Sequence, residues 1–299
     1  MDSITILIKR VLILSFFLLL IVPSAHAISV SMDVTTTSDE VDVSSTDLKC
    51  LTASGECSLR AAIMELNNIT SASVTDVTIN LDPSLLSTPA SSATYTLSLT
   101  TCGMGRTDIC DSLKVLVKYP LTIVGTDPEK VIIDANNIDR VFQLNAGTST
   151  TLQNVTITNG NVTDTTDTYG GGIFVDKAAS LSLSQVILKD NIANSTAATA
   201  SGGGIYLSSY AALDIEQSSF EANHANGSTI AHGGALQASG NNTITVDNTE
   251  FVLNRAEGTA TGAMAFGGAI FISSTSDIEI TNESLIDNNL AESYDQDAY

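Results

Sequence analysis

The chain has 299 residues, with 33 acidic side chains against 12 lysines and arginines and a formal net charge of -21 at pH 7. A charge of this sign excludes nucleic acid and anionic membrane surfaces as natural partners, because both attract basic proteins. Hydrophobic residues make up 43% of the chain, which is enough for a folded core, but tryptophan is absent.

Residues 1–27 have the pattern of a secretory signal peptide. Lys9 and Arg10 precede an apolar run from Val11 to Val22, and small residues lead up to Ala27. We expect cleavage after Ala27. The apolar run is short for a bilayer span, so an uncleaved anchor is the weaker alternative. No second run long enough to cross a membrane follows, and we therefore expect a secreted or cell-surface protein.

All four cysteines fall within residues 28–115, which we interpret as an N-terminal cap region: Cys50, Cys57, Cys102 and Cys110. Behind a signal peptide, disulfides are the expected state. Three pairings are possible. The short separations make Cys50 with Cys57 and Cys102 with Cys110 the most economical, each closing a small loop. A zinc site is the weaker alternative, because no Cys-x-x-Cys spacing occurs.

The same region contains the chain's best helix candidate, residues 58–68. Leu59, Ala62, Ile63 and Leu66 share one face, and Ser58 can cap the N-terminus. A stack of parallel strands ends in an open apolar column that needs a cover. We expect the helix to provide it.

Residues 116–299 are a series of repeats. Three sequence features recur in them with the same small changes in spacing from copy to copy. A glycine pair followed by a small and an aliphatic residue recurs four times, with steps of 32, 31 and 34 residues between copies; the second glycines are Gly171, Gly203, Gly234 and Gly268. Alternating apolar pairs recur with the same steps: Leu181/Leu183, Leu213/Ile215, Ile244/Val246 and Ile278/Ile280. So do asparagines three residues after Leu188, Phe220, Phe251 and Leu285: Asn191, Asn223, Asn254 and Asn288.

Alternation of apolar and polar residues within each repeat is the period of a strand with one buried face. One repeat has too few apolar side chains to offset the entropy of ordering its backbone, so successive copies must stack. The pattern predicts an all-β fold, a parallel β-helix of right-handed coils, continuous with the cap. The strands extend upstream to Phe142, Leu152 and Ile157 without the glycines. We interpret both series as structural, with glycines at one corner and asparagines stacked at another.

Residues Cys57 to Ile63, with the Asn pair that follows them, resemble the Cys-Ser-Leu-Arg-Glu-Ala (CSLREA) domain at the start of secreted bacterial β-helix proteins. Ala61 stands where that family usually has Glu. The Gly-Gly-Ala-Ile and Phe-x-x-Asn motifs, such as Gly267 to Ile270 and Phe220 to Asn223, are similar to repeats of the chlamydial polymorphic membrane proteins. The resemblance implies a pectin-lyase-like solenoid on a secreted or outer-membrane-associated protein, with adhesion as the expected activity.

The main alternative is a polysaccharide lyase or hydrolase on the same fold. Arg255 lies in the repeats near Glu250 and Glu257, and we interpret it as part of a surface ion pair. His232 occupies the first position of a glycine motif. Aromatic residues such as Phe174 and Tyr206 fall on the stacking strands, so a platform of exposed rings for sugars is not evident. We expect no catalytic residues and no resident cofactor.

Outward-facing acids on the strands form a candidate stripe for calcium, which is the weaker hypothesis beside a solvated acidic surface: Asp214, Glu216, Asp247, Asp277 and Glu279. Expected partners are host-surface or extracellular glycans and proteins. The printed chain stops at Tyr299 soon after a repeat, which predicts either a longer protein or a partner on the last coil. We therefore expect a structural or adhesive module, with a polysaccharide-active enzyme or a calcium- or glycan-binding module as the alternatives.

Overall fold

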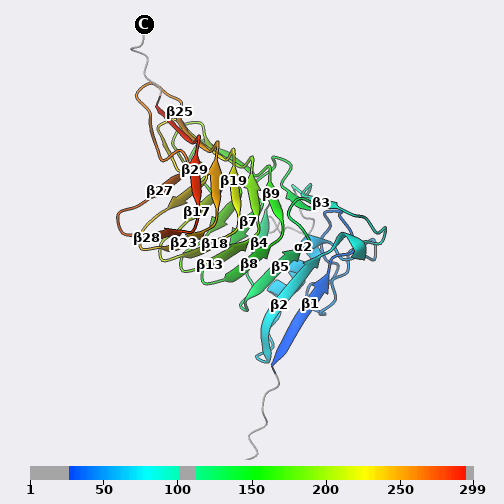
Figure 1. Ribbon diagram of the computed structural model, residues 1–299. Coiled ribbons are helices and arrows are strands. Elements are labelled where there is room, and N and C mark those ends of the chain that lie inside the picture. Colours follow the sequence, from blue (N-terminus) through cyan, green and yellow to red (C-terminus); the bar gives the residue numbers. More distant parts are fainter. Residues whose placement is uncertain (1–26, 101–111, 294–299) are drawn as a thin grey trace, which may run out of the picture.

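The computed structural model describes residues 27–100 and 112–293 (Figure 1). In that part of the chain the strands of successive coils pair in parallel and stack along one axis, from β1 to β29. The expected parallel β-helix is therefore confirmed. Three sheets enclose the core and two further sheets form a projection beside it.

Sheet 1 is the longest and consists, in spatial order, of β1 (Ile28–Asp33), β2 (Val74–Leu81), β5 (Leu121–Gly125), β8 (Ser149–Gln153), β13 (Ser180–Ser184), β18 (Ala212–Glu216), β23 (Thr243–Asp247) and β28 (Asp277–Thr281). Sheet 2 consists of β3 (Ala93–Thr96), β6 (Val131–Asp134), β9 (Thr156–Thr158), β14 (Ile187–Lys189), β19 (Ser219–Glu221), β24 (Glu250–Val252) and β29 (Leu285–Asp287). Sheet 3 consists of β4 (Leu113–Val115), β7 (Phe142–Leu144), β12 (Ile173–Val175), β17 (Ile205–Leu207), β22 (Leu236–Ala238) and β27 (Ile270–Ile272).

The core is a set of columns of apolar side chains, one from each coil. In sheet 1, Leu152, Leu183, Ile215 and Val246 lie in register on neighbouring strands and are fully buried. In sheet 2, Phe220 pairs with Phe251, with ring centroids 4.6 Å apart and ring planes 15° from parallel. Because each coil covers the next, the apolar area that no single repeat could bury is removed from water collectively.

Helix α2 (Leu59–Asn67) lies where expected, at the N-terminal end of the tube, with its apolar side chains in the main core. Ser58 is its N-cap: the Ser58 hydroxyl accepts a hydrogen bond from Ala61 N at 3.0 Å and donates to the Glu40 carbonyl at 2.6 Å. The cap therefore uses only half of a capping box, since the methyl group of Ala61 cannot accept the return hydrogen bond. A short 3-10 helix, η1 (Pro83–Leu85), follows β2.

Between sheets 2 and 3 the chain leaves the tube and returns, and these excursions stack into a projection, hereafter the fin. Sheet 4 of the fin consists of β10 (Asn161–Asp164), β15 (Ile192–Ser195), β20 (His224–Gly227), β25 (Arg255–Gly258) and β30 (Leu290–Ser293). Sheet 5 consists of β11 (Thr168–Tyr169), β16 (Thr199–Ser201), β21 (Ile230–His232) and β26 (Met264–Phe266). The coil that precedes β10 passes from β6 to β7 without such an excursion.

The fin has a core of its own made of alanine. Its fully buried side chains are Ala193, Ala200, Ala225, Ala231 and Ala256, with Ala265 packed against them. Methyl groups fill little space, so the two sheets can lie close together as a thin double layer.

The glycine motif lies where the fin rejoins the tube. The first glycine of each copy has a positive φ, for example +66° at Gly202. A Cβ on the second glycine would meet backbone: on Gly203 it would lie 2.4 Å from the His224 carbonyl carbon and 2.5 Å from the Gly234 carbonyl oxygen. Gly171, Gly234 and Gly268 are obstructed in the same way. The second glycine thus allows the chain to pass against the base of the fin.

The asparagines form a buried ladder where sheet 2 ends and the fin begins. Asn223 Nδ2 donates to Asn254 Oδ1 at 2.9 Å and to the Leu188 carbonyl at 2.8 Å, and Asn191 Nδ2 donates to Asn223 Oδ1 at 3.0 Å. The next position of the ladder is Asn289, whose Oδ1 accepts from Asn254 Nδ2 at 2.9 Å.

The prediction of Asn288 as the fourth residue of the ladder was therefore wrong by one position, because Asn289 takes that place. The last coil has one residue more between β28 and β29, where Asn282 and Glu283 both have positive φ. Phe251 consequently pairs with Ile286, and not with the expected Leu285. Asn288, with φ +52°, takes the place that left-handed Leu253 has in the preceding coil.

We predict that Asn223→Ala destabilises the protein by about 3 kcal/mol, since it leaves the buried amide of Asn191 and backbone groups without partners at about 1–3 kcal/mol each. Urea unfolding followed by circular dichroism measures the loss. Asn226→Ala is the matched control, because Asn226 is a half-exposed asparagine on the next strand. Equal effects of the two substitutions would contradict a structural ladder.

Candidate functional site

The cap region contains one of the two expected disulfides. Cys50 and Cys57, seven positions apart in the sequence, are bonded and close a small loop just before helix α2. Cys102 and Cys110 lie outside the described residues. The pairing of the first two cysteines confirms the oxidised state for that half of the cap and leaves no Cys50 or Cys57 thiolate for zinc.

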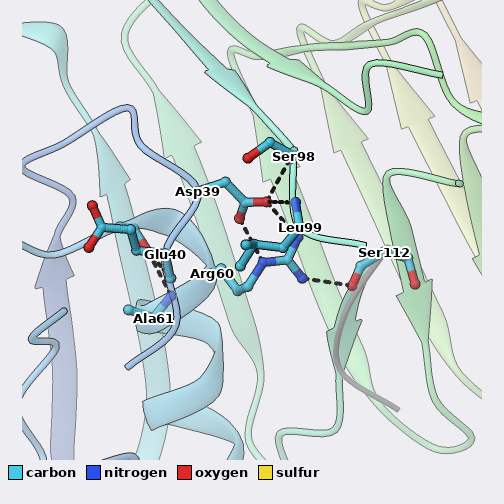
Figure 2. A network of polar contacts seen from close by, with 8 residues as sticks. Asp39, Glu40, Arg60, Ala61, Ser98, Leu99 and Ser112 are labelled. Atoms are coloured by element: carbon cyan, nitrogen blue, oxygen red, sulfur yellow. Dashed lines mark hydrogen bonds and ion pairs between the residues drawn. The ribbon is translucent and has the colours of Figure 1, made fainter. Parts of the chain in front are cut away.

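Arg60, in the motif that resembles the CSLREA domain, is the centre of a buried polar network (Figure 2). Its Nε and Nη2 donate to the two carboxylate oxygens of Asp39 at 2.6 and 3.0 Å, and both side chains are only 2% exposed. Asp39 also accepts from the backbone N–H groups of Ser98 and Leu99 at 2.7 and 3.0 Å, and Arg60 Nη1 donates to the Ser112 carbonyl at 3.3 Å. The network joins segments far apart in sequence, so its role is to hold the cap together.

Glu65, on the same helix, is fully buried. One carboxylate oxygen accepts from Leu48 N, and the other, Oε2, has no hydrogen-bond partner in the described chain. Burial, with the charges of Asp42 and Asp47 nearby, raises the pKa of Glu65 above its usual value. The ionised form is thus disfavoured in the folded protein.

The outer face of sheet 3 and the fin meet in a corner lined by rings. Phe174, Tyr206, Gln237 and Phe271 occupy one row of sheet 3 in register. The facing row of sheet 5 contains Tyr169, Ser201, His232 and Phe266. The rows are in contact, with centroid distances of 4.6 Å between Tyr169 and Tyr206 and 4.4 Å between His232 and Phe271. The rings therefore hold the fin against the tube.

Phe174 and its neighbours cover part of one another's ring faces. Phe174 stacks on Tyr206, with an angle of 8° between the ring planes. The Arg140 guanidinium lies over the Phe174 ring, 5.6 Å from its centre. His232, which the sequence places at the first position of a glycine motif, is part of this packing, and burial lowers its pKa.

Arg140 completes the edge of the fin. In later coils the carbonyls before the glycine motif accept hydrogen bonds from the preceding coil, as Ser201 O does from Gly170 N at 3.0 Å. The coil before β11 has no fin, and Arg140 replaces the missing donors by reaching the carbonyls of Tyr169 and Gly170 at 3.3 and 3.4 Å. The repeat pattern does not single out Arg140, because this residue precedes the clear repeats.

The acidic stripe lies on the outer face of sheet 1, where hydroxyl residues separate most of its members. Asp214 stands between Ser182 and Thr245, and the Thr245 hydroxyl donates to it. Asp247 is adjacent to Glu216 in register and accepts from the Thr281 hydroxyl at 2.7 Å. No group of three or more His, Cys, Asp or Glu side chains suited to a metal ion occurs in residues 27–100 and 112–293. Calcium binding stays a prediction.

Arg255 lies on the outer face of sheet 4 and pairs with Glu257 at 3.0 Å and Glu292 at 2.7 Å. Glu257 also contacts His224 at 3.2 Å. Burial lowers the pKa of His224, and this outweighs the opposite effect of Glu257. The expected surface ion pair is present with Glu257, whereas Glu250, in strand β24, belongs to sheet 2.

Helix α2 is too short to cross a bilayer, and no other helix in the described part of the chain is long and apolar enough to do so. Comparison with known proteins finds no matching family model, no matching curated protein and no matching solved structure.

We predict that Glu65→Gln is more stable than the parent at pH 7 and that the difference shrinks as the pH falls. The folded pKa of Glu65 lies above the unfolded value, so the parent is stabilised at low pH by the protonated acid and loses that contribution as the pH rises through the folded pKa. Thermal unfolding between pH 4 and 8 measures the difference. Exposed Glu129→Gln is the control, and a difference independent of pH would contradict the assignment.

Proposed function

We propose that this chain is a secreted, cell-surface β-helix module that acts in adhesion, with the fin as its contact surface. The observation that carries the proposal is the fin itself. The apolar core lies in the tube, and the fin contributes only alanine methyls to a separate small cluster.

The energetics of the fin support a role other than stability. Each excursion orders about ten residues at roughly 1–2 kcal/mol of backbone entropy per residue, and the burial of alanine methyls offsets little of it. In return the protein gains the outward face of sheet 4, with polar residues in register, such as Asn194 beside Asn226. A broad, thin, rigid surface of this kind suits contact with another macromolecule or with an extracellular matrix.

Enzymatic activity on polysaccharides is the competing function. The same preparation distinguishes the two, because an enzyme releases unsaturated or reducing products from uronate polymers whereas an adhesive module only retains its partner.

The test is binding of the full secreted chain, displayed on fluorescent beads, to cultured cells and to extracellular glycans and proteins. We predict specific retention that falls about tenfold or more in Asn194→Ala/Asn226→Ala, which changes the outer face of sheet 4. Ser182→Ala/Thr243→Ala, on the outer face of sheet 1, is the matched control and should bind like the parent. Retention of neither cells nor matrix, together with turnover of a uronate polymer, would overturn the proposal.

A further inference from the structure

A hollow of about 270 Å³ lies where the fin begins, between its first strands and the outer face of sheet 3. Its size is just below the roughly 300–1,000 Å³ typical of pockets for drug-sized ligands. The hollow exists because β7 continues sheet 3 one coil further than the fin extends. Its polar lining includes Arg140, Gln143, Asp164, Asp167 and Thr168.

The Arg140 guanidinium provides one side of the hollow with positive charge. It is half-buried and makes no ion pair with any carboxylate in the described chain, and its Nη1 has no hydrogen-bond partner there. Burial lowers the pKa of Arg140, which reports the cost of desolvating this cation. A carboxylate placed against Nη1 would relieve that cost, since charge-assisted hydrogen bonds are strongest between these groups.

Two carboxylates lie on the fin side of the hollow. Asp164 Oδ1 accepts from the backbone N–H groups of Thr165 and Thr166, which lowers the pKa of Asp164. Asp167 accepts from Thr199 N at 3.0 Å and from the Tyr169 hydroxyl at 3.1 Å. These hydrogen bonds hold both carboxylates in place.

The charges in the hollow select the class of ligand. Two carboxylates and one guanidinium repel a simple anion, and a simple cation leaves Arg140 without a carboxylate partner. The ring of Phe174 is covered by Tyr206 and Arg140, so stacking does not recruit a neutral sugar.

We propose that this hollow binds a small zwitterion of the amino-acid type, with its carboxylate on Arg140 and its ammonium group beside Asp164 and Asp167. The site is independent of the adhesive surface proposed above. It adds recognition of a small molecule at the first coil that has a fin.

The test is isothermal titration of the full secreted chain with the common amino acids. At least one should bind saturably at a single site. The N-acetyl derivative of that amino acid, which lacks the ammonium, and its amide, which lacks the carboxylate, should each bind at least about tenfold more weakly, a difference of 1.4 kcal/mol. Absence of binding by every amino acid, or equal binding of the N-acetyl derivative, would overturn the proposal.

Variants locate the site. Asp164→Asn keeps the oxygen that accepts the turn hydrogen bonds and removes the charge, so we expect a folded protein with binding weakened about tenfold. Arg140→Gln should abolish binding, and thermal unfolding shows whether it still folds. Asp176→Asn is the matched control, because Asp176 accepts from Lys177 N in a surface turn away from the hollow. Unchanged binding in Asp164→Asn would contradict the assignment even where Arg140→Gln is unstable.

Discussion

Register between coils is the constraint on which the rest of this structure depends. In a parallel ladder each residue lies beside its counterpart in the next coil, so any side chain repeats its environment along the axis. Buried Leu183, Ile215 and Val246 form a column for this reason, and so do the alanines of the fin. A polar residue is tolerated in such a column only if its neighbours satisfy it, as the amides of the asparagine ladder do for one another.

The same constraint explains how the fin is attached. Where the chain leaves sheet 2, the ladder of asparagines satisfies backbone groups that the change of direction frees. Where the chain returns, the second glycine of each motif lets two stretches of backbone pass in contact. The asparagine and glycine motifs therefore mark the two ends of one excursion. This explains why their spacings change together along the sequence.

Much of the fold was predictable because it depends on side chains that recur. Strong periodic signals, such as Leu181/Leu183 and the glycine pairs, identified the coils, and the face shared by Leu59 and Leu66 identified helix α2. The fin was not predicted, since alanine and small polar residues have little hydrophobic contrast with their neighbours. Asn289 was missed because the last coil has one extra residue before β29. The repeat spacing alone points to the neighbouring Asn288. Arg140 was not predicted, because it donates to carbonyls only at the first edge of the fin. This role occurs once and therefore leaves no repeat in the sequence.

The direction of the hydrogen bonds has a mechanical consequence. Strands run across the tube, so both the backbone ladders and the asparagine amides point along its axis. A force along that axis would act parallel to these hydrogen bonds and would separate the coils one after another. A sideways pull on the fin would instead be carried by covalent backbone through the glycine and asparagine corners into every coil at once. A partner held on the fin would thus load the molecule in its stronger direction.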